Sequence, residues 1–123
     1  MPSILVIDDE QPLREALRFT LEEEGYDVVD AENGRTGIDI YRQSPTDLVI
    51  TDIVMPDYEG METILTFKRE FPEARIIAMS GREKSGPASF LSMAEKLGAG
   101  YTLTKPFRRA ELLSAIRQSL NGH

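Results

Sequence analysis

Five short apolar runs alternate along the chain with five stretches of helical periodicity, and no other feature of the sequence restricts the fold so strongly. The runs are rich in β-branched residues and predict strands over residues 3–7, 27–31, 47–51, 75–79 and 101–104. Apolar residues at helical spacing predict a helix between Pro12 and Gly25, and further helices over residues 34–42, 60–70, 87–97 and 108–120. Gly98 is placed to end the fourth of these helices. Such alternation is typical of βα units around a parallel sheet.

The predicted architecture is an α/β fold, a flavodoxin-like, doubly wound (βα)5 sandwich. Right-handed crossovers between five parallel strands favour the strand order 2-1-3-4-5. At 123 residues the chain fits one domain, and no linker or repeat divides it, so we expect a single domain over residues 1–123. Ligands of such sheets bind beyond the carboxyl ends of the strands.

Composition excludes several kinds of function. The chain has no cysteine, so it can have neither a disulfide framework nor a thiolate site. Its formal net charge of -7 has the wrong sign for direct binding to nucleic acid. The amino terminus lacks a basic signal segment and no apolar run is long enough to cross a bilayer, which predicts a cytoplasmic protein without membrane contact.

Polar and charged residues follow four of the predicted strands. They are Asp8, Asp9 and Glu10 after the first strand, Asp52 after the third, Ser80 after the fourth and Lys105 after the fifth. Taken singly, each has a purely structural interpretation, because acids cap helices, aspartate and serine begin turns, and lysines are mostly solvated. Together they fall at the edge where this topology places its binding site.

The chemistry of this group of residues favours phosphoryl transfer. Carboxylates this close repel one another unless a cation lies among them. Oxygen ligands without histidine or cysteine favour a hard ion, and Mg²⁺ is the predicted cofactor. Lys105 and Ser80 would face the oxygens of a phosphoryl group, and Asp52 is the candidate nucleophile that forms an aspartyl phosphate.

Four segments match one known family in order and spacing: LVIDDE, DLVITDIVMPDYEG, IIAMSG and GAGYTLTKPF. Over essentially the whole chain, the sequence resembles the receiver domain of bacterial two-component response regulators, especially the stand-alone kind similar to the chemotaxis regulator. The resemblance implies a phosphorylation-controlled switch that catalyses its own phosphorylation and dephosphorylation but is not a turnover enzyme. It also implies a sensor histidine kinase or a histidine phosphotransfer protein as the phosphodonor.

The resemblance assigns a role to each acidic residue of the site. Asp52 would be the phosphorylated aspartate. Asp9, Asp52 and the backbone carbonyl of Val54 would ligate Mg²⁺, while Asp8 would act on the ion through bound water.

The remaining site residues also receive roles from the resemblance. Lys105 would pair with Asp52 before the reaction and with the phosphoryl oxygens after it, and the bond from Lys105 to Pro106 would be cis. Ser80 would move toward the phosphoryl group on activation. The output surface, formed by the fourth helix, fifth strand and fifth helix, would bind a downstream protein.

The sequence departs from the family pattern in two places. An aromatic residue is expected three positions before Lys105, and Thr102 stands there instead. Tyr101 should point to the opposite face of the strand, since side chains alternate. The stretch from Ser80 to Lys105 is also longer than in compact members, and the glycines and charges of residues 81–87 suggest a mobile loop there.

Three other interpretations remain open. An aspartate-nucleophile phosphatase needs a D-x-D element on the first strand, whereas Asp8 and Asp9 are adjacent. A flavin-binding module shares the topology, but the acidic loop after the first strand would repel a flavin phosphate. A binding module that is never phosphorylated would keep the same fold, and phosphoacceptor activity would separate it from the switch.

Overall fold

A parallel five-stranded sheet lies at the centre of the protein, in a computed structural model that describes residues 2–53, 59–81, 95–96 and 98–121. The strands are β1 (Ser3–Ile7), β2 (Asp27–Ala31), β3 (Leu48–Asp52), β4 (Ile76–Ser80) and β5 (Tyr101–Thr104). Their order across the sheet is β2-β1-β3-β4-β5, and every neighbouring pair is parallel. The predicted strand order and the predicted fold class are therefore confirmed.

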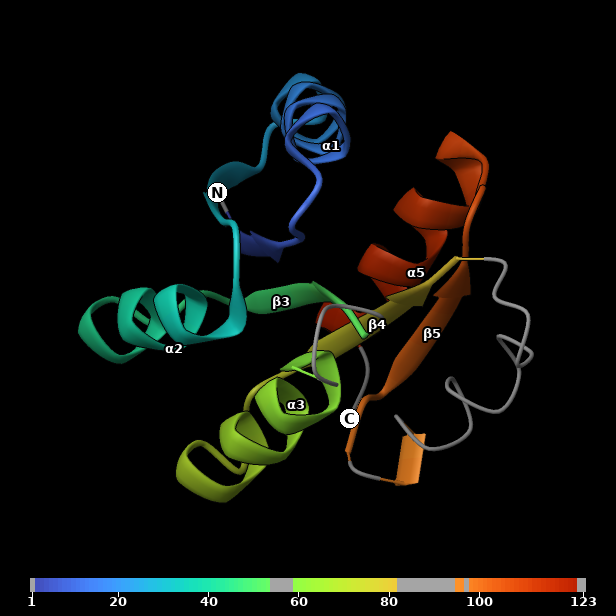
Figure 1. The fold of residues 1–123 in the computed structure, drawn as a ribbon. Helices are drawn as coiled ribbons and strands as arrows, with labels where there is room; N and C mark the ends of the chain where they lie inside the picture. Colours follow the sequence, from blue (N-terminus) through green and yellow to red (C-terminus); the bar gives the residue numbers. More distant parts are fainter. Residues whose placement is uncertain (1, 54–58, 82–94, 97, 122–123) are drawn as a thin grey trace.

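Helices cover both faces of the sheet. They are α1 (Gln11–Glu23), α2 (Gly34–Gln43), α3 (Glu59–Glu70) and α5 (Arg109–Asn121). Figure 1 shows α1 and α5 on one side of the sheet and α2 and α3 on the other. Of the predicted helix over residues 87–97, only residues 95 and 96 belong to the described part of the chain, and both are helical. No helix in the described ranges is long and apolar enough to cross a membrane.

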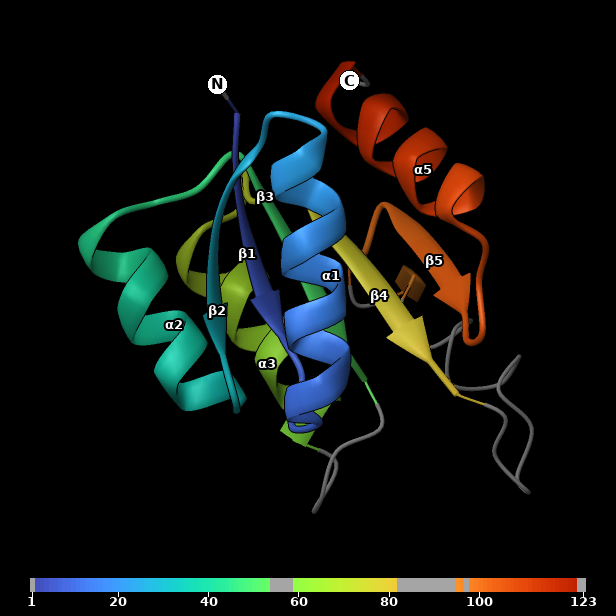
Figure 2. The same cartoon turned by 90° about the horizontal axis from the view of Figure 1, so that it is seen from above.

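The core consists of two apolar layers, one on each face of the sheet. One layer packs residues of the sheet against α2 and α3, and its largest fully buried side chain is Phe67. The other packs the sheet against α1 and α5, with Leu17, Leu21, Leu112 and Ile116 buried. Figure 2 shows the sheet with α1 and α5 on its near side. Every residue of β3 and β4 is buried, as expected of strands covered on both faces.

Two of the predicted strands were placed one residue too early. β3 and β4 were predicted over residues 47–51 and 75–79, but the ladder continues through Asp52, paired with Met79, and Ser80, paired with Thr104. Both polar residues stay in the ladder and are buried. Asp52 and Ser80 are thus the last residues of their strands, so the sheet itself holds their backbones.

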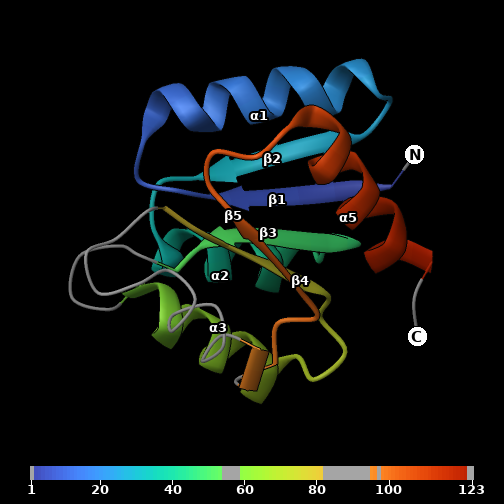
Figure 3. The ribbon, with the colours of Figure 1, turned by 90° about the vertical axis from the view of Figure 1, so that its right-hand side faces the viewer.

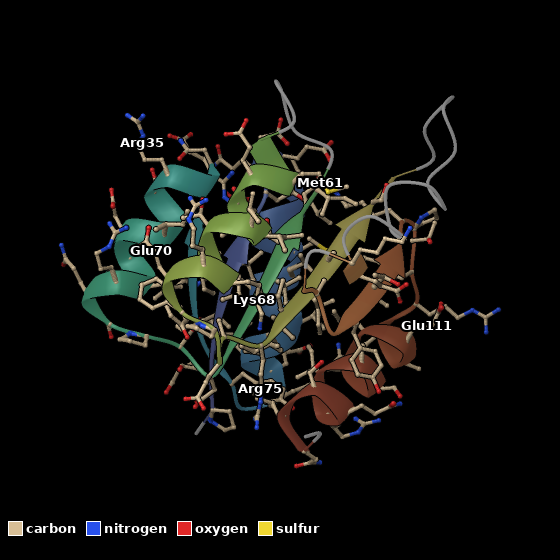
Figure 4. The ribbon with its side chains drawn as sticks, turned by 90° about the horizontal axis from the view of Figure 1, so that it is seen from below. Arg35, Met61, Lys68, Glu70, Arg75 and Glu111 are labelled. Carbon is tan, nitrogen blue, oxygen red and sulfur yellow. The ribbon has the colours of Figure 1, made fainter. Side chains whose placement is uncertain are left out.

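A side-chain cap and left-handed glycines mark several of the helix ends in the described residues. The side chain of Asn33 caps α2 by accepting a hydrogen bond from the amide of Thr36 at 2.8 Å. Gly25, just after α1, has a φ of 92°, and Gly98 has a φ of 125°, so both predicted helix-ending glycines adopt the left-handed conformation. Lys68 of α3, labelled in Figure 4, donates to the carbonyls of Pro72 and Ala74 and thereby closes the end of α3.

Candidate functional site

Three carboxylates meet at the carboxyl ends of β1 and β3. Asp8 directly follows β1, Asp52 ends β3, and Glu10 precedes α1. One carboxylate oxygen from each residue lies within 4.8 Å of the others. Asp8 is fully buried and Asp52 is 4% exposed. So much negative charge out of water requires a compensating cation.

Lys105, directly after β5, supplies positive charge to this cluster. Its Nζ lies 2.9 Å from Oδ2 of Asp8 and 3.0 Å from Oδ2 of Asp52, and both contacts are hydrogen bonds. Oε1 of Glu10 is farther away, at 3.7 Å. The ammonium therefore bridges the two buried carboxylates, and the peptide bond from Lys105 to Pro106 is cis.

The pKa of Lys105 reports the balance of forces on its ammonium. Burial lowers this pKa, but the hydrogen bonds and charges of Asp8 and Asp52 together outweigh burial and raise it above its ordinary value. Because the raised pKa belongs to the folded state, the stabilisation is fully present below lysine's unfolded value of about 10.4. It is lost only as pH rises through the folded pKa, so the bridge is intact at neutral pH.

Lys105→Met is expected to destabilise the protein in a pH-dependent way. The substitution leaves two buried carboxylates without their shared donor, which should lower the free energy of unfolding by about 2 kcal/mol near neutral pH. The difference from the unsubstituted protein should shrink only at strongly alkaline pH, because the stabilisation by Lys105 is lost as pH rises through its raised pKa. Urea denaturation near neutral pH and at alkaline pH measures this effect. Lys96→Met, at an exposed position, is the control, and an equal loss in both variants would contradict the bridging role.

Four bonds hold Asp8 in place. Its amide donates to the carbonyl of Ala31 at 3.1 Å, which extends the pairing of β1 with β2 by one residue. Its Oδ1 accepts from the amide of Glu10 at 2.9 Å, and its Oδ2 accepts from Lys105. The fourth bond reaches its backbone carbonyl, which accepts from Nη1 of Arg14 at 2.7 Å. Both the backbone and the side chain of Asp8 are thus held in place between β1 and α1.

The other predicted site residues differ in where they lie relative to the acidic cluster. Asp9 is exposed and lies outside the three-carboxylate cluster, where Glu10 stands instead. Ser80 is fully buried, and its hydroxyl donates to the carbonyl of Gly81 at 3.3 Å. Val54 and most of the predicted loop over residues 81–87 lie outside the described residues.

Thr102 and Tyr101 lie on opposite faces of β5. Tyr101 packs against the apolar layer under α1 and α5, and its hydroxyl donates to Oε1 of Gln118 in α5. Thr102 pairs with Ala78, and the alternation of side chains along a strand directs it to the other face of the sheet. The ring of Tyr101 is therefore engaged on the side of the sheet away from the position that Thr102 occupies.

The acidic cluster fits a hard divalent cation. Its donors are carboxylate oxygens from Asp8, Glu10 and Asp52, close enough together to share one ion. Mg²⁺ typically takes one or two carboxylates and completes its shell with water and phosphate oxygens. Glu10 is the exposed member of the cluster and lies at its solvent side, where such an ion would enter.

Sequence reasoning missed two contributors to the site. The sequence puts Glu10 at the sheet edge without indicating a role for it, and it indicates none for Arg14. Arg14 is four positions after Glu10, so it lies one turn into α1 on the same face. An arginine in that position of an amphipathic helix can indicate a contact with the sheet edge. Only the structure shows that Arg14 reaches the carbonyl of Asp8, just after β1.

Comparison with known proteins gives one consistent result. The family model described as response regulator receiver domain matches residues 4–117. A crystal structure of a response regulator receiver domain protein from Clostridium thermocellum is 32% identical, with a TM-score of 0.90, covering 98% of this chain and 95% of that chain. A two-component response regulator of the LuxR family from an Aurantimonas species is 30% identical, with a TM-score of 0.89, covering 100% of this chain and 87% of that chain.

A chemotaxis protein shows the same likeness. CheY4 of Vibrio cholerae is 26% identical, with a TM-score of 0.86, and the alignment covers 98% of this chain and 99% of that chain. The match to the family model spans most of the chain, including the acidic cluster, Ser80 and Lys105. The chain therefore belongs to the response regulator receiver domain family of two-component signalling.

Proposed function

We propose that residues 1–123 form one receiver domain in which Asp52 accepts a phosphoryl group with the help of Mg²⁺. Membership of the family gives the chain a role in phosphorylation-controlled signalling. The observation that carries the finer assignment is the Lys105 ammonium, which bridges Asp8 and Asp52 at the carboxyl ends of the strands. Asp52 is the member of this group that combines burial with a position at the end of a central strand.

Asp52 would act as the nucleophile. One oxygen of its carboxylate forms a bond to phosphorus while the bond from phosphorus to the donor breaks, and the leaving group takes up a proton. With a histidine kinase or a histidine phosphotransfer protein as donor, the leaving group is a histidine imidazole. The product is an aspartyl phosphate, which splits the transfer into two easier steps.

Lys105 and Ser80 would stabilise the transferred group. Lys105 already donates to Oδ2 of Asp52, so a short movement brings its charge to the phosphoryl oxygens. The Ser80 hydroxyl would exchange its bond to the Gly81 carbonyl for a bond to a phosphoryl oxygen. Through that exchange, phosphorylation of Asp52 would act on the end of β4, and this is the proposed start of the conformational response.

Asp9, Asp52 and the carbonyl of Val54 would hold Mg²⁺, with Asp8 acting through water and Glu10 close by. When bound, the ion neutralises negative charge between the acceptor carboxylate and the incoming phosphoryl group. Asp8 would remain bonded to Lys105 and thus hold the ammonium beside Asp52.

The proposed output surface lies at the edge of the sheet that β5 forms. β5 and α5 belong to the described residues, and the fourth helix of the predicted output surface falls mostly outside them. Thr102 replaces the aromatic residue that the family uses to couple Ser80 to this surface. The proposed coupling therefore runs through β4 and β5 themselves, where Ser80 pairs with Thr104.

Intact-mass spectrometry after incubation with acetyl phosphate tests this function. With Mg²⁺, the protein should gain a single phosphoryl group. With EDTA in place of Mg²⁺, the gain should fall to the level of a sample without phosphodonor. A protein that never gains mass under either condition would be a binding module that keeps the fold without phosphorylation.

A further inference from the structure

A side chain of α1 binds the backbone carbonyl of Asp8, the residue that follows β1 beside the acidic cluster. The last ladder bond of this strand is made by the amide of Asp8, which donates to Ala31. The carbonyl of Asp8 accepts instead from Nη1 of Arg14 at 2.7 Å. A bond from a charged guanidinium is shorter and stronger than a bond between neutral groups. Arg14 therefore fixes the peptide plane that joins Asp8 to Asp9.

Arg14 is itself held from β2. Its Nε lies 3.2 Å from Oδ2 of Asp30, and Nη1 of Arg18 lies 3.3 Å from Oδ1 of the same carboxylate. The side chain of Arg14 is 14% exposed and that of Asp30 is 28% exposed, so water competes less for this pair than for a surface pair. Figure 3 shows α1 running along β2 and β1, which lets one arginine reach both strands.

We propose that Arg14 is a positioning residue for the metal site, because its bond to the Asp8 carbonyl sets the direction in which Asp9 leaves the strand. The inference rests on the proposed function, in which Asp9 is a ligand of Mg²⁺. The buried carboxylate of Asp8 keeps its bond from Lys105 without Arg14, because Lys105 comes from another strand end. Rotation of the peptide after Asp8 would therefore displace Asp9 while leaving the buried pair of Asp8 and Lys105 in place.

The guanidinium group suits this role better than an ammonium would. Its planar fork donates to a carboxylate and to a carbonyl at the same time, whereas a lysine at position 14 offers a point charge on a flexible stem. Both arginine bonds are made within one side chain, so Asp30 and the Asp8 carbonyl are coupled through a rigid group. If Arg14 loses its bond to Asp30, its bond to the Asp8 carbonyl should weaken as well.

Isothermal titration of the folded, unphosphorylated protein with Mg²⁺ tests the proposal. Arg14→Met should weaken Mg²⁺ binding by about tenfold, the usual consequence of removing a group that orients a metal ligand. Asp30→Asn should weaken it in the same direction. Arg18→Met is the matched control, since Arg18 contacts the same Asp30 but not Asp8, and its Kd should change by less than about twofold.

A second measurement needs no metal. In the metal-free protein, amide hydrogen exchange at Asp9 and Glu10 should be faster in Arg14→Met than in Arg18→Met, because the peptide plane after Asp8 is no longer fixed. If Arg14→Met does not fold, Arg14→Lys replaces it, with weaker Mg²⁺ binding expected from the lost fork.

The outcomes separate this proposal from the proposed function. If Arg14→Met lowers the melting temperature but binds Mg²⁺ with an unchanged Kd, Arg14 is only structural and the positioning role is wrong. An equal loss of affinity in Arg18→Met would contradict it as well. If the unsubstituted protein binds no Mg²⁺, the metal-dependent part of the proposed function fails, and the positioning role falls with it.

Discussion

Asp52→Asn is expected to abolish phosphoryl uptake and to leave the protein folded. The amide has the size of the carboxylate but is too weak a nucleophile to form a bond to phosphorus, so the mass gain with acetyl phosphate and Mg²⁺ should fall to the background level. Stability should change by no more than about 1 kcal/mol, because the amide oxygen accepts only a weaker bond from Lys105, and this loss is offset by reduced repulsion within the acidic cluster. Intact-mass spectrometry and urea denaturation measure the two effects.

Asp47→Asn is the matched control for this substitution. Asp47 directly precedes β3, at the opposite end of the strand that Asp52 closes. Its Oδ2 accepts from the amide of Ser3 at 2.8 Å, far from the acidic cluster. The control should therefore keep full phosphoryl uptake. Uptake by Asp52→Asn at the level of Asp47→Asn would mean that another residue accepts the group.

Gly60→Ala is expected to be among the most damaging single substitutions in the core. Gly60 is buried in the first turn of α3, and an added Cβ would lie 2.3 Å from Cα and 2.5 Å from the carbonyl carbon of Ile53. These are backbone atoms next to Asp52, and they cannot rotate away. We expect a loss of about 3 kcal/mol in the free energy of unfolding, together with slower phosphoryl uptake, since α3 or the end of β3 must move.

Gly37→Ala is the control for this substitution. Gly37 is also a buried helical glycine, but the added Cβ would meet Cδ1 of Ile7 at 2.4 Å, the far end of a side chain. Ile7 can change rotamer, so we expect a loss of about 1 kcal/mol and normal phosphoryl uptake. Thermal denaturation of both variants decides the comparison. Equal losses would mean that the backbone near Ile53 yields as easily as a side chain.

Periodicity was enough to predict the fold, and its errors have a simple physical cause. Continuous apolar runs identified β1 and the buried parts of β3 and β4. The ends of β3 and β4 were misplaced by one residue because Asp52 and Ser80 are polar but remain in the ladder. A hydropathy pattern depends on the polarity of the side chains, whereas strand pairing depends on backbone hydrogen bonds.

The composition of the site was also largely predictable, but its internal geometry was not. In a parallel sheet the ends of β1, β3, β4 and β5 meet at one edge, which brings Asp8, Asp52 and Lys105 together. Which of the acids at 9 and 10 joins the cluster depends on the turn between β1 and α1. The bond from Arg14 ends on a backbone carbonyl, and such a contact leaves no pattern in the sequence.

The central claim is that Asp52 carries the phosphoryl group, and chemical mapping tests it most directly. Borohydride reduces an aspartyl phosphate to homoserine, and tandem mass spectrometry of the digested protein locates the converted residue. After treatment with acetyl phosphate and Mg²⁺, homoserine should occur at position 52 and be missing from the EDTA sample. Homoserine at Asp8 or Asp9, or none at all in a protein that has gained mass, would contradict the account.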